Sequence, residues 1–173
     1  MKIFCVLLGL LMASCARPGG YDGIMTRSYR VRGSTHHPMS VDQGLQYQAV
    51  GVASWYNESK FLGLVRGKTS LGEKVMPWHL IAAHKTLPLP CVVRVTHLGN
   101  GKSVKVRVND RGPFIEGRLI DLSPRAAGRL GMKEEGLAMV RVEVLSVGDG
   151  PHRRRVRRGF WSMNDTILHQ LRF

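Results

Sequence analysis

Three side chains in the sequence can take up and release protons, and each stands where a reaction could use it. Asp110 ends a strand-like run and lies in Asn109–Phe114, whose Gly-Pro step directs the backbone. Glu73 closes a short stretch that begins at Ser70, and His84 ends an apolar run. Carboxylates and imidazoles are common general acids and bases. Each also has a structural alternative: Asp110 could cap its turn, Glu73 could be a solvated loop residue, and His84 could be a hydrogen-bonded core group.

Strand patterns run through the segment 48–146 and would position these side chains. Residues 91–98 and 103–108 alternate apolar with polar side chains around turn residues, which predicts a β-hairpin. Residues 48–56, 119–122 and 140–145 are also expected to be strands, and residues 80–84 a strand or a short helix.

One short helix is predicted in the same segment. Ser123 followed by Pro124 is a helix start signal, and Gly131 stands where a helix from Pro124 to about Leu130 would stop. Short strands with one small helix predict a mainly β fold that closes into a small barrel. The chain can bury a hydrophobic core of its own, because 43% of its 173 residues are hydrophobic.

The first residues have the pattern of an export signal. Lys2, an apolar run over residues 3–12 and the small pair Ala13-Ser14 predict a signal peptide over residues 1–14. Residues 11–15 also resemble the bacterial lipobox, in which the cysteine, here Cys15, is acylated after cleavage and anchors the chain in a membrane. Arg17 is not the aspartate associated with inner-membrane retention, which favours the outer membrane, facing the periplasm. An ordinary signal peptide ending near a cysteine is the alternative.

The segments flanking the predicted barrel are basic and lack clear apolar periodicity. Residues 15–47 are expected to form a lipidated N-terminus and a flexible tether, and residues 147–173 a mobile basic tail. The net charge of +14 would suit nucleic acid, but export argues against that partner. Anionic groups in the cell wall or at a membrane could meet this charge equally well.

The three cysteines are too few and too widely spaced for a disulfide framework or a zinc site. Cys5 would be removed with the signal and Cys15 acylated, so Cys91 is expected to be a buried, inert thiol. We therefore expect neither a metal nor another cofactor.

Five motifs occur in an order that is similar to the RlpA-like (rare lipoprotein A) family. They are Gly51-Val52-Ala53-Ser54-Trp55-Tyr56, Thr69 to Glu73, Ala82-Ala83-His84-Lys85-Thr86-Leu87-Pro88, Val108-Asn109-Asp110-Arg111-Gly112-Pro113-Phe114 and Ile120-Asp121-Leu122-Ser123. The resemblance implies a six-stranded double-psi β-barrel with one or two short helices. Its better-known members are septal lytic transglycosylases that cut peptidoglycan glycan strands.

The resemblance also implies roles for single residues. Asp110 would be the general acid and base, Glu73 a second carboxylate, and His84 an orienter of a carboxylate or sugar. In this reaction the C6 hydroxyl of the muramic residue attacks its own anomeric carbon and leaves a 1,6-anhydro end, so one well-placed acid/base can suffice. The expected substrate-binding residues are Trp55, Tyr56, Asn109, Arg111 and Phe114. Of the aromatic rings, Trp55, Tyr56, Trp78 and Phe114 could stack on sugar faces, and at least half of them are expected to lie in the core. Asp121 is expected to pair with Arg111 or Arg118 or to bond the barrel turn.

Other functions remain open on the sequence. A non-catalytic, expansin-like module that binds glycan or loosens the wall is one, because the short segment after Leu145 has no room for the SPOR domain that many relatives carry. A structural envelope lipoprotein whose basic tail recruits partners is another. The expected partners are peptidoglycan strands and the membrane through Cys15, with envelope or divisome proteins as further candidates.

Overall fold

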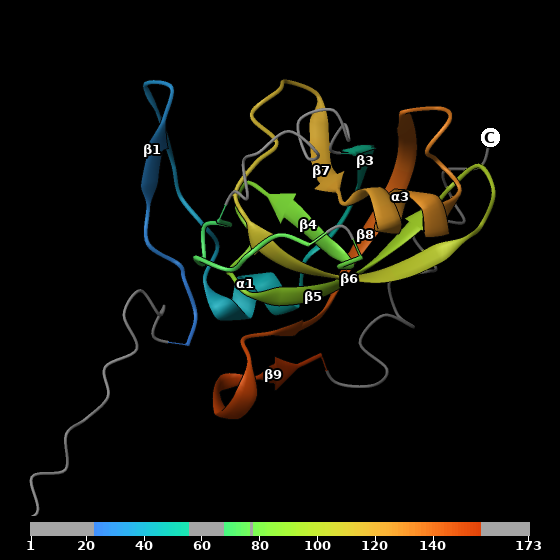
Figure 1. Ribbon diagram of the computed structural model, residues 1–173. Helices are drawn as coiled ribbons and strands as arrows, with labels where there is room; N and C mark the ends of the chain where they lie inside the picture. The colour runs from blue at the N-terminus through green and yellow to red at the C-terminus, as the bar shows by residue number, and fades with distance from the viewer. Residues whose placement is uncertain (1–22, 56–67, 77, 157–173) are drawn as a thin grey trace, which may run out of the picture.

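Six strands close into a ring in the computed structural model, which describes residues 23–55, 68–76 and 78–156 (Figure 1). The order around the ring is β3-β7-β4-β6-β5-β8, and β8 pairs back onto β3. The strands are β3 (Gln48–Trp55), β4 (Ile81–His84), β5 (Cys91–His97), β6 (Ser103–Asp110), β7 (Arg118–Leu122) and β8 (Leu137–Val147). The mainly β, six-stranded barrel expected from the sequence is confirmed, and residues 81–84 are a strand rather than a helix.

Two of the pairings in the ring are parallel. β3 runs parallel to β7, and β4 runs parallel to β6, whereas the other neighbours are antiparallel. Parallel neighbours need crossover connections, so segments distant in sequence meet at one end of the barrel. Here the ends of β4 and β6 lie side by side, with Ala83 opposite Asp110.

The alternating strands bury one face each. In β5 every second residue, from Cys91 to His97, is buried, as the period of two predicts. The largest fully buried side chains are Leu87, Leu89, Ile120, Leu122, Leu130, Met132, Val93, Val95, Val106, Val108, Val140 and Val142. Branched aliphatic side chains therefore fill the barrel interior, as in other small barrels.

The predicted helix is α3 (Pro124–Leu130). The side chain of Ser123 accepts from the backbone of Ala126, and Gly131 ends the helix in the left-handed conformation at φ 78°. Both end signals in the sequence thus work as expected.

The prediction of a flexible tether is wrong for residues 23–47. This segment forms a hairpin of β1 (Tyr29–Val31) and β2 (Ser34–His36), followed by the helix α1 (Val41–Leu45). Ser40 and Gln43 form a capping box at the start of α1. Met25 exchanges two backbone hydrogen bonds with Leu89. Backbone bonding and caps hold this segment, and the side chains of Ile24, Met25, Met39, Val41 and Leu45 pack against the core.

The tail prediction is also corrected for its first residues. A turn of 3₁₀ helix at Gly150–His152 leads into β9 (Arg154–Arg155), which pairs with β8. Residues 157–173 lie outside the described residues. Over the described part of the chain, no helix is long and apolar enough to cross a membrane. Cys91 is a free, buried thiol, and its burial raises its pKa to about 12.

Candidate functional site

Asp110 is the last residue of β6, directly after an irregularity in the strand. Ala82 pairs with Val108 and Ala83 with Asp110, so Asn109 is the extra residue of a bulge. Bulges re-aim side chains and are common beside active sites. The bulge puts the end of β6 next to the turn that follows Lys68.

The side chain of Asp110 is held by that turn. Its Oδ1 accepts hydrogen bonds from the backbone N of Ser70 (2.9 Å), from Ser70 Oγ (2.6 Å) and from the backbone N of Arg111 (2.8 Å). Within the described residues no hydrogen bond reaches Oδ2. One oxygen of the carboxyl group is therefore fixed as an acceptor and the other is left for a ligand.

The turn itself spans Thr69–Glu73. Its backbone closes through Thr69 N to Glu73 O (3.0 Å) and Gly72 N to Thr69 O (2.7 Å). Gly72 has φ 76°, which favours glycine. One end of the turn presents Ser70 to Asp110, and the other end carries Glu73. The structure therefore places the predicted site residues Asp110 and Glu73 at the same turn.

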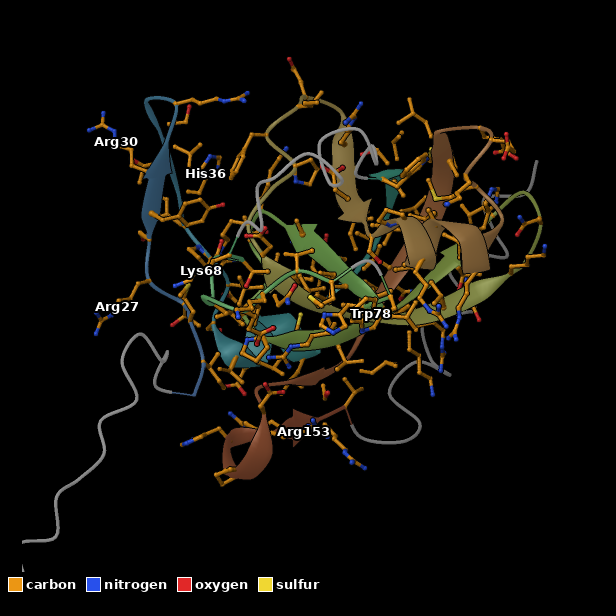
Figure 2. The ribbon with its side chains drawn as sticks, viewed as in Figure 1. Arg27, Arg30, His36, Lys68, Trp78 and Arg153 are labelled. Carbon is orange, nitrogen blue, oxygen red and sulfur yellow. The ribbon has the colours of Figure 1, made fainter. Side chains whose placement is uncertain are left out.

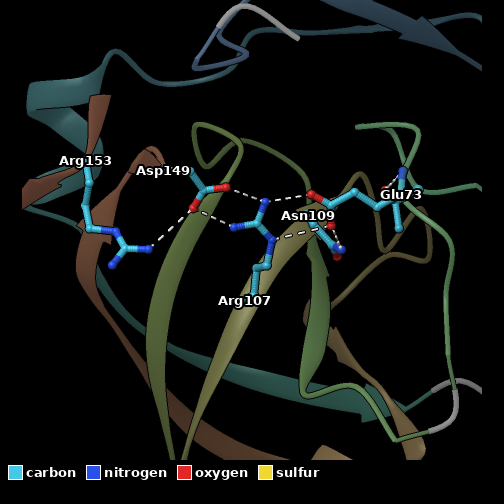
Figure 3. A network of polar contacts seen from close by, with 6 residues as sticks. Glu73, Arg107, Asn109, Asp149 and Arg153 are labelled. Carbon is cyan, nitrogen blue, oxygen red and sulfur yellow. Dashed lines mark hydrogen bonds and ion pairs between the residues drawn. The ribbon is translucent and has the colours of Figure 1, made fainter. Parts of the chain in front are cut away.

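Glu73 belongs to a chain of charges across the outside of β6 (Figure 3). Arg107 contacts its Oε1 at 2.6 Å, and Asn109 donates from Nδ2 to its Oε2 at 2.7 Å. The same arginine pairs with both oxygens of Asp149, which is followed at 3.7 Å by Arg153. Arg107 and Asn109 share one face of the strand, being two residues apart. The carboxylate of Glu73 is thus held by two donors from one strand.

The guanidinium group of Arg111 bonds backbone carbonyls, and no ion pair joins it to Asp110 within the described residues. It donates to the backbone carbonyls of Lys85, Leu87 and Met25. Its charge also lies 5.2 Å from the centre of the Tyr29 ring. The guanidinium of Arg111 thus joins the N-terminal segment to the loop after β4, and its expected role in substrate binding stays a prediction.

His84 is not brought to either carboxylate. It is 3% exposed, and its Nδ1 accepts from the backbone N of Thr86 (3.2 Å) and of Leu87 (3.1 Å). Its Nε2 therefore carries the proton and donates to the hydroxyl of Tyr47 (3.1 Å). Burial, then Arg111 and Lys85, lower the pKa of His84 to about 3. The expected orienting role is not supported: His84 is neutral, and both its nitrogens are used by the protein.

The N-terminal hairpin contacts the loop that follows Asp110, a contact that the sequence did not predict. Phe114 lies in the loop after Asp110 and packs against His36 (5.5 Å between ring centres) and Tyr29 (6.3 Å). The Tyr29 hydroxyl donates to the carbonyl of Lys85 at 2.9 Å. Phe114, expected to bind substrate, is half-buried in this aromatic cluster.

The remaining predicted residues are placed as follows. Trp55 ends β3, packs partly on the core and has Lys133 5.7 Å from its ring centre. Asn109 is 2% exposed and donates to Glu73, and its expected contact with substrate stays a prediction. Asp121 accepts from the hydroxyl of Ser54, and burial raises its pKa. Tyr56 and Cys15 lie outside the described residues.

Among the described residues no group of three or more His, Cys, Asp or Glu side chains could hold a metal ion. The two carboxylates of the site are of the residue type used as general acids and bases. The carboxylates of Asp110 and Glu73 lie at the two ends of one turn, and donors reach one oxygen of Asp110 and both oxygens of Glu73.

Known proteins resemble this chain over the barrel and the candidate site. A family model described as "Lytic transglycolase" matches residues 48–142. The Endolytic peptidoglycan transglycosylase RlpA of Pseudomonas aeruginosa (strain UCBPP-PA14) is 52% identical over 129 residues, covering 74% of this chain and 36% of that protein. The protein of the same name from Vibrio cholerae serotype O1 is 38% identical over 178 residues, covering 87% of this chain and 65% of that protein. This chain spans about a third to two thirds of these relatives.

Solved structures show a weaker likeness. The apo expansin of Clavibacter michiganensis superposes with a TM-score of 0.46 and 20% identity, covering 61% of this chain and 54% of that chain. The family model, by contrast, covers more than half of the chain, including all six barrel strands in whole or part, Glu73 and Asp110. The resemblance found in the sequence motifs is confirmed, and the chain belongs to the RlpA-like family of lytic transglycolases.

Proposed function

We propose that this chain is a peptidoglycan lytic transglycosylase in which Asp110 is the general acid and base. The observation that carries the proposal is the binding of Asp110. Ser70 and the backbone of Arg111 hold Oδ1, and Oδ2 is the carboxyl oxygen that no donor among the described residues occupies. Since a general acid must be held in a fixed direction toward the leaving oxygen, this geometry suits the task.

The reaction needs one proton to move in each direction. Asp110 would give its proton to the glycosidic oxygen between the muramic residue and the next glucosamine, and the bond from that oxygen to the anomeric carbon breaks. The C6 hydroxyl oxygen of the same muramic residue then bonds to the anomeric carbon. Its proton passes to the Asp110 carboxylate, which restores the acid. The products are a 1,6-anhydro end and a free hydroxyl, and no water is consumed.

Glu73 is the second carboxylate of this proposal. Its negative charge lies near the same turn and would favour the positive charge that develops on the sugar ring. Arg107 and Asn109 hold it in place, so little reorganisation is needed when that charge appears.

We further propose that the chain is exported and anchored in the outer membrane, facing the periplasm, through acylation of Cys15. The signal-like residues 1–14 and the lipobox-like residues 11–15 support this location. Metabolic labelling with a clickable palmitate analogue should tag the wild-type chain and leave Cys15→Ala untagged. Equal labelling of Cys15→Ala would contradict lipidation at this residue.

The activity is tested by mass spectrometry of peptidoglycan incubated with the full chain in detergent. Intact and amidase-stripped glycan are both offered, and wild type is compared with Asp110→Asn. Asp42→Asn is the matched control, because it makes the same chemical change at an exposed position of helix α1. Wild type and Asp42→Asn should release 1,6-anhydromuramic products, and Asp110→Asn should release none while remaining folded. Glycan co-sedimentation without products from any variant would instead favour the non-catalytic binding module.

A further inference from the structure

A groove continues from Glu73 to helix α3 and is lined by more positive than negative charge. Its volume is about 480 Å³, and its polar and aromatic lining residues are Glu73, Trp78, His79, Arg107, Arg125 and Arg129. Glu73 is the one carboxylate in this lining, against three arginines. The groove thus starts at the candidate site and becomes cationic away from it.

The walls of the groove are tied together by hydrogen bonds. Ser123, which caps α3, donates from Oγ to the carbonyl of His79 at 2.7 Å. Its backbone N bonds the carbonyl of Ile81 at 2.9 Å, and the backbone N of Arg107 bonds the carbonyl of Leu80 at 2.9 Å. The segment before β4, strand β6 and helix α3 therefore form one preorganised surface.

Arg125 and Arg129 lie four residues apart on α3, so their side chains share one face of the helix. Both are exposed. No ion pair is recorded for either within the described residues, and α3 has no acidic residue in its first turn. Like charges at this spacing weaken a helix. Arg129 is favourably placed in the last turn of the helix, but its repulsion with Arg125 remains, and an anionic ligand would offset that repulsion.

Trp78 supplies an apolar surface at the same groove. Its residue is 59% exposed, and it stands beside His79 with the rings edge to face, 6.2 Å apart. A large exposed indole next to arginines suits a ligand that has both a flat apolar face and negative charge. A sugar ring that bears a carboxylate fits this description.

We propose that this groove binds the carboxylate groups of the glycan, with Arg125 and Arg129 pairing with the carboxylates and Trp78 packing on a sugar. The inference rests on the proposed function for the identity of the polymer. Peptidoglycan offers such carboxylates from two sources. One is the lactyl group of muramic residues whose peptides have been removed, and the other is the stem peptides themselves.

The experiment compares three ligands in an Asp110→Asn background, so that no ligand is cut during binding. They are amidase-stripped glycan, the same glycan with its carboxylates converted to methylamides, and peptide-bearing glycan. The groove variant is Arg125→Gln with Arg129→Gln. The matched control is Arg27→Gln with Arg30→Gln, which removes the same charge from the β1 side of the molecule, away from Trp78 (Figure 2).

The groove variant should lose about tenfold in affinity for at least one carboxylate-bearing glycan, while the control pair changes it less than twofold. On the methylamide glycan the groove variant and its parent should bind equally, because the partner charge is gone. A loss on stripped glycan identifies the lactyl carboxylate, and a loss confined to peptide-bearing glycan identifies the stem peptides. Equal affinity of parent and groove variant on all three ligands, or an equal loss on the methylamide glycan, would overturn the inference.

Failure of the activity is separable from failure of the groove. If the chain with Asp110 intact releases no anhydro products but the arginine pair still controls binding, the transglycosylase proposal falls and the groove stands. If products form and the arginine pair changes neither affinity nor KM, the groove proposal falls and the activity stands.

Discussion

Nδ2 of Asn109 donates to Oε2 of Glu73 over 2.7 Å. The next residue, Asp110, accepts from Ser70 at the other end of the same turn. Two consecutive residues on β6 thus hold the two ends of Thr69–Glu73, and the bulge at Asn109 allows both contacts. The spacing between the two carboxyl groups is set by this strand end rather than by a long loop.

Replacing Asn109 tests that arrangement. Asn109→Leu removes the donor to Glu73, so we expect product formation to fall roughly tenfold and unfolding free energy to fall by about 1–2 kcal/mol. The measurements are the rate of anhydromuramic release and urea unfolding. Asn100→Leu is the control, since Asn100 also makes side-chain bonds, to Leu130 and Lys102, but far along the strand from Glu73. Equal activity losses in both variants would argue that Asn109 acts only through stability.

The buried His84 predicts a pH dependence of stability. Its pKa is about 3 in the folded chain against 6.5 ordinarily. Between these values the unfolded chain binds a proton that the folded chain does not, so stability falls as pH drops through this window. Relative to wild type, His84→Asn should flatten the loss between pH 7 and pH 4 by up to about 3 kcal/mol.

Urea unfolding at several pH values measures this slope. His37→Asn serves as the control because His37 is exposed. If His84 instead moved a proton during the reaction, its replacement would remove a limb of the pH–rate profile, which we expect to stay in place.

The contact between Tyr29 and Arg111 predicts that the N-terminal hairpin supports the site. Tyr29→Ala removes both the ring beside the guanidinium and the bond to Lys85, and should lower unfolding free energy by about 2–3 kcal/mol. Tyr29→Phe keeps the ring and should cost about 1 kcal/mol. Thermal and urea unfolding measure the order of stability, which should be wild type, then Tyr29→Phe, then Tyr29→Ala. Thr35→Ala, at an exposed position of β2, should change neither stability nor product formation; a cost as large as that of Tyr29→Ala would contradict the role of the ring.

Two serine caps separate helix stability from groove geometry. Ser123→Ala and Ser40→Ala each remove an N-cap and should each cost about 1 kcal/mol. Only Ser123 also bonds His79, in the wall of the groove. Ser123→Ala should therefore weaken glycan affinity several-fold, and Ser40→Ala should leave it unchanged. Calorimetric melting and glycan co-sedimentation, measured on the same samples, would show whether the loss of glycan affinity is separate from the loss of stability.

The barrel could be predicted from the sequence because apolar and polar residues alternate along its strands. The hairpin at residues 91–98 and 103–108 and the capped helix after Ser123 each have a local signal that tertiary contacts reinforce. The N-terminal hairpin has no such signal. It docks through the backbone of Met25 and through rings on Arg111 and Phe114, contacts whose partners lie far away in the sequence.

The site was only partly predictable for a similar reason. The motifs around Glu73 and Asp110 point to the right turn and strand end. They do not show where side chains aim. His84 accepts two backbone amides two and three residues ahead of it, and His97 does the same with Gly99 and Asn100. A histidine two residues before a tight turn thus indicates a structural role. This agrees with the alternative, stated from the sequence, that His84 is a hydrogen-bonded core group.

The closure of the ring by β3 and β8 has a consequence for how the chain reaches its native state. Gln48, the first residue of the barrel, pairs with Glu143 near its end. Loop-closure entropy makes such long-range pairing slow, and the core stays open until the last strand arrives. A chain emerging from its N-terminus would therefore hold no finished barrel until nearly all of it is available, and a fragment truncated before β8 should fail to fold cooperatively.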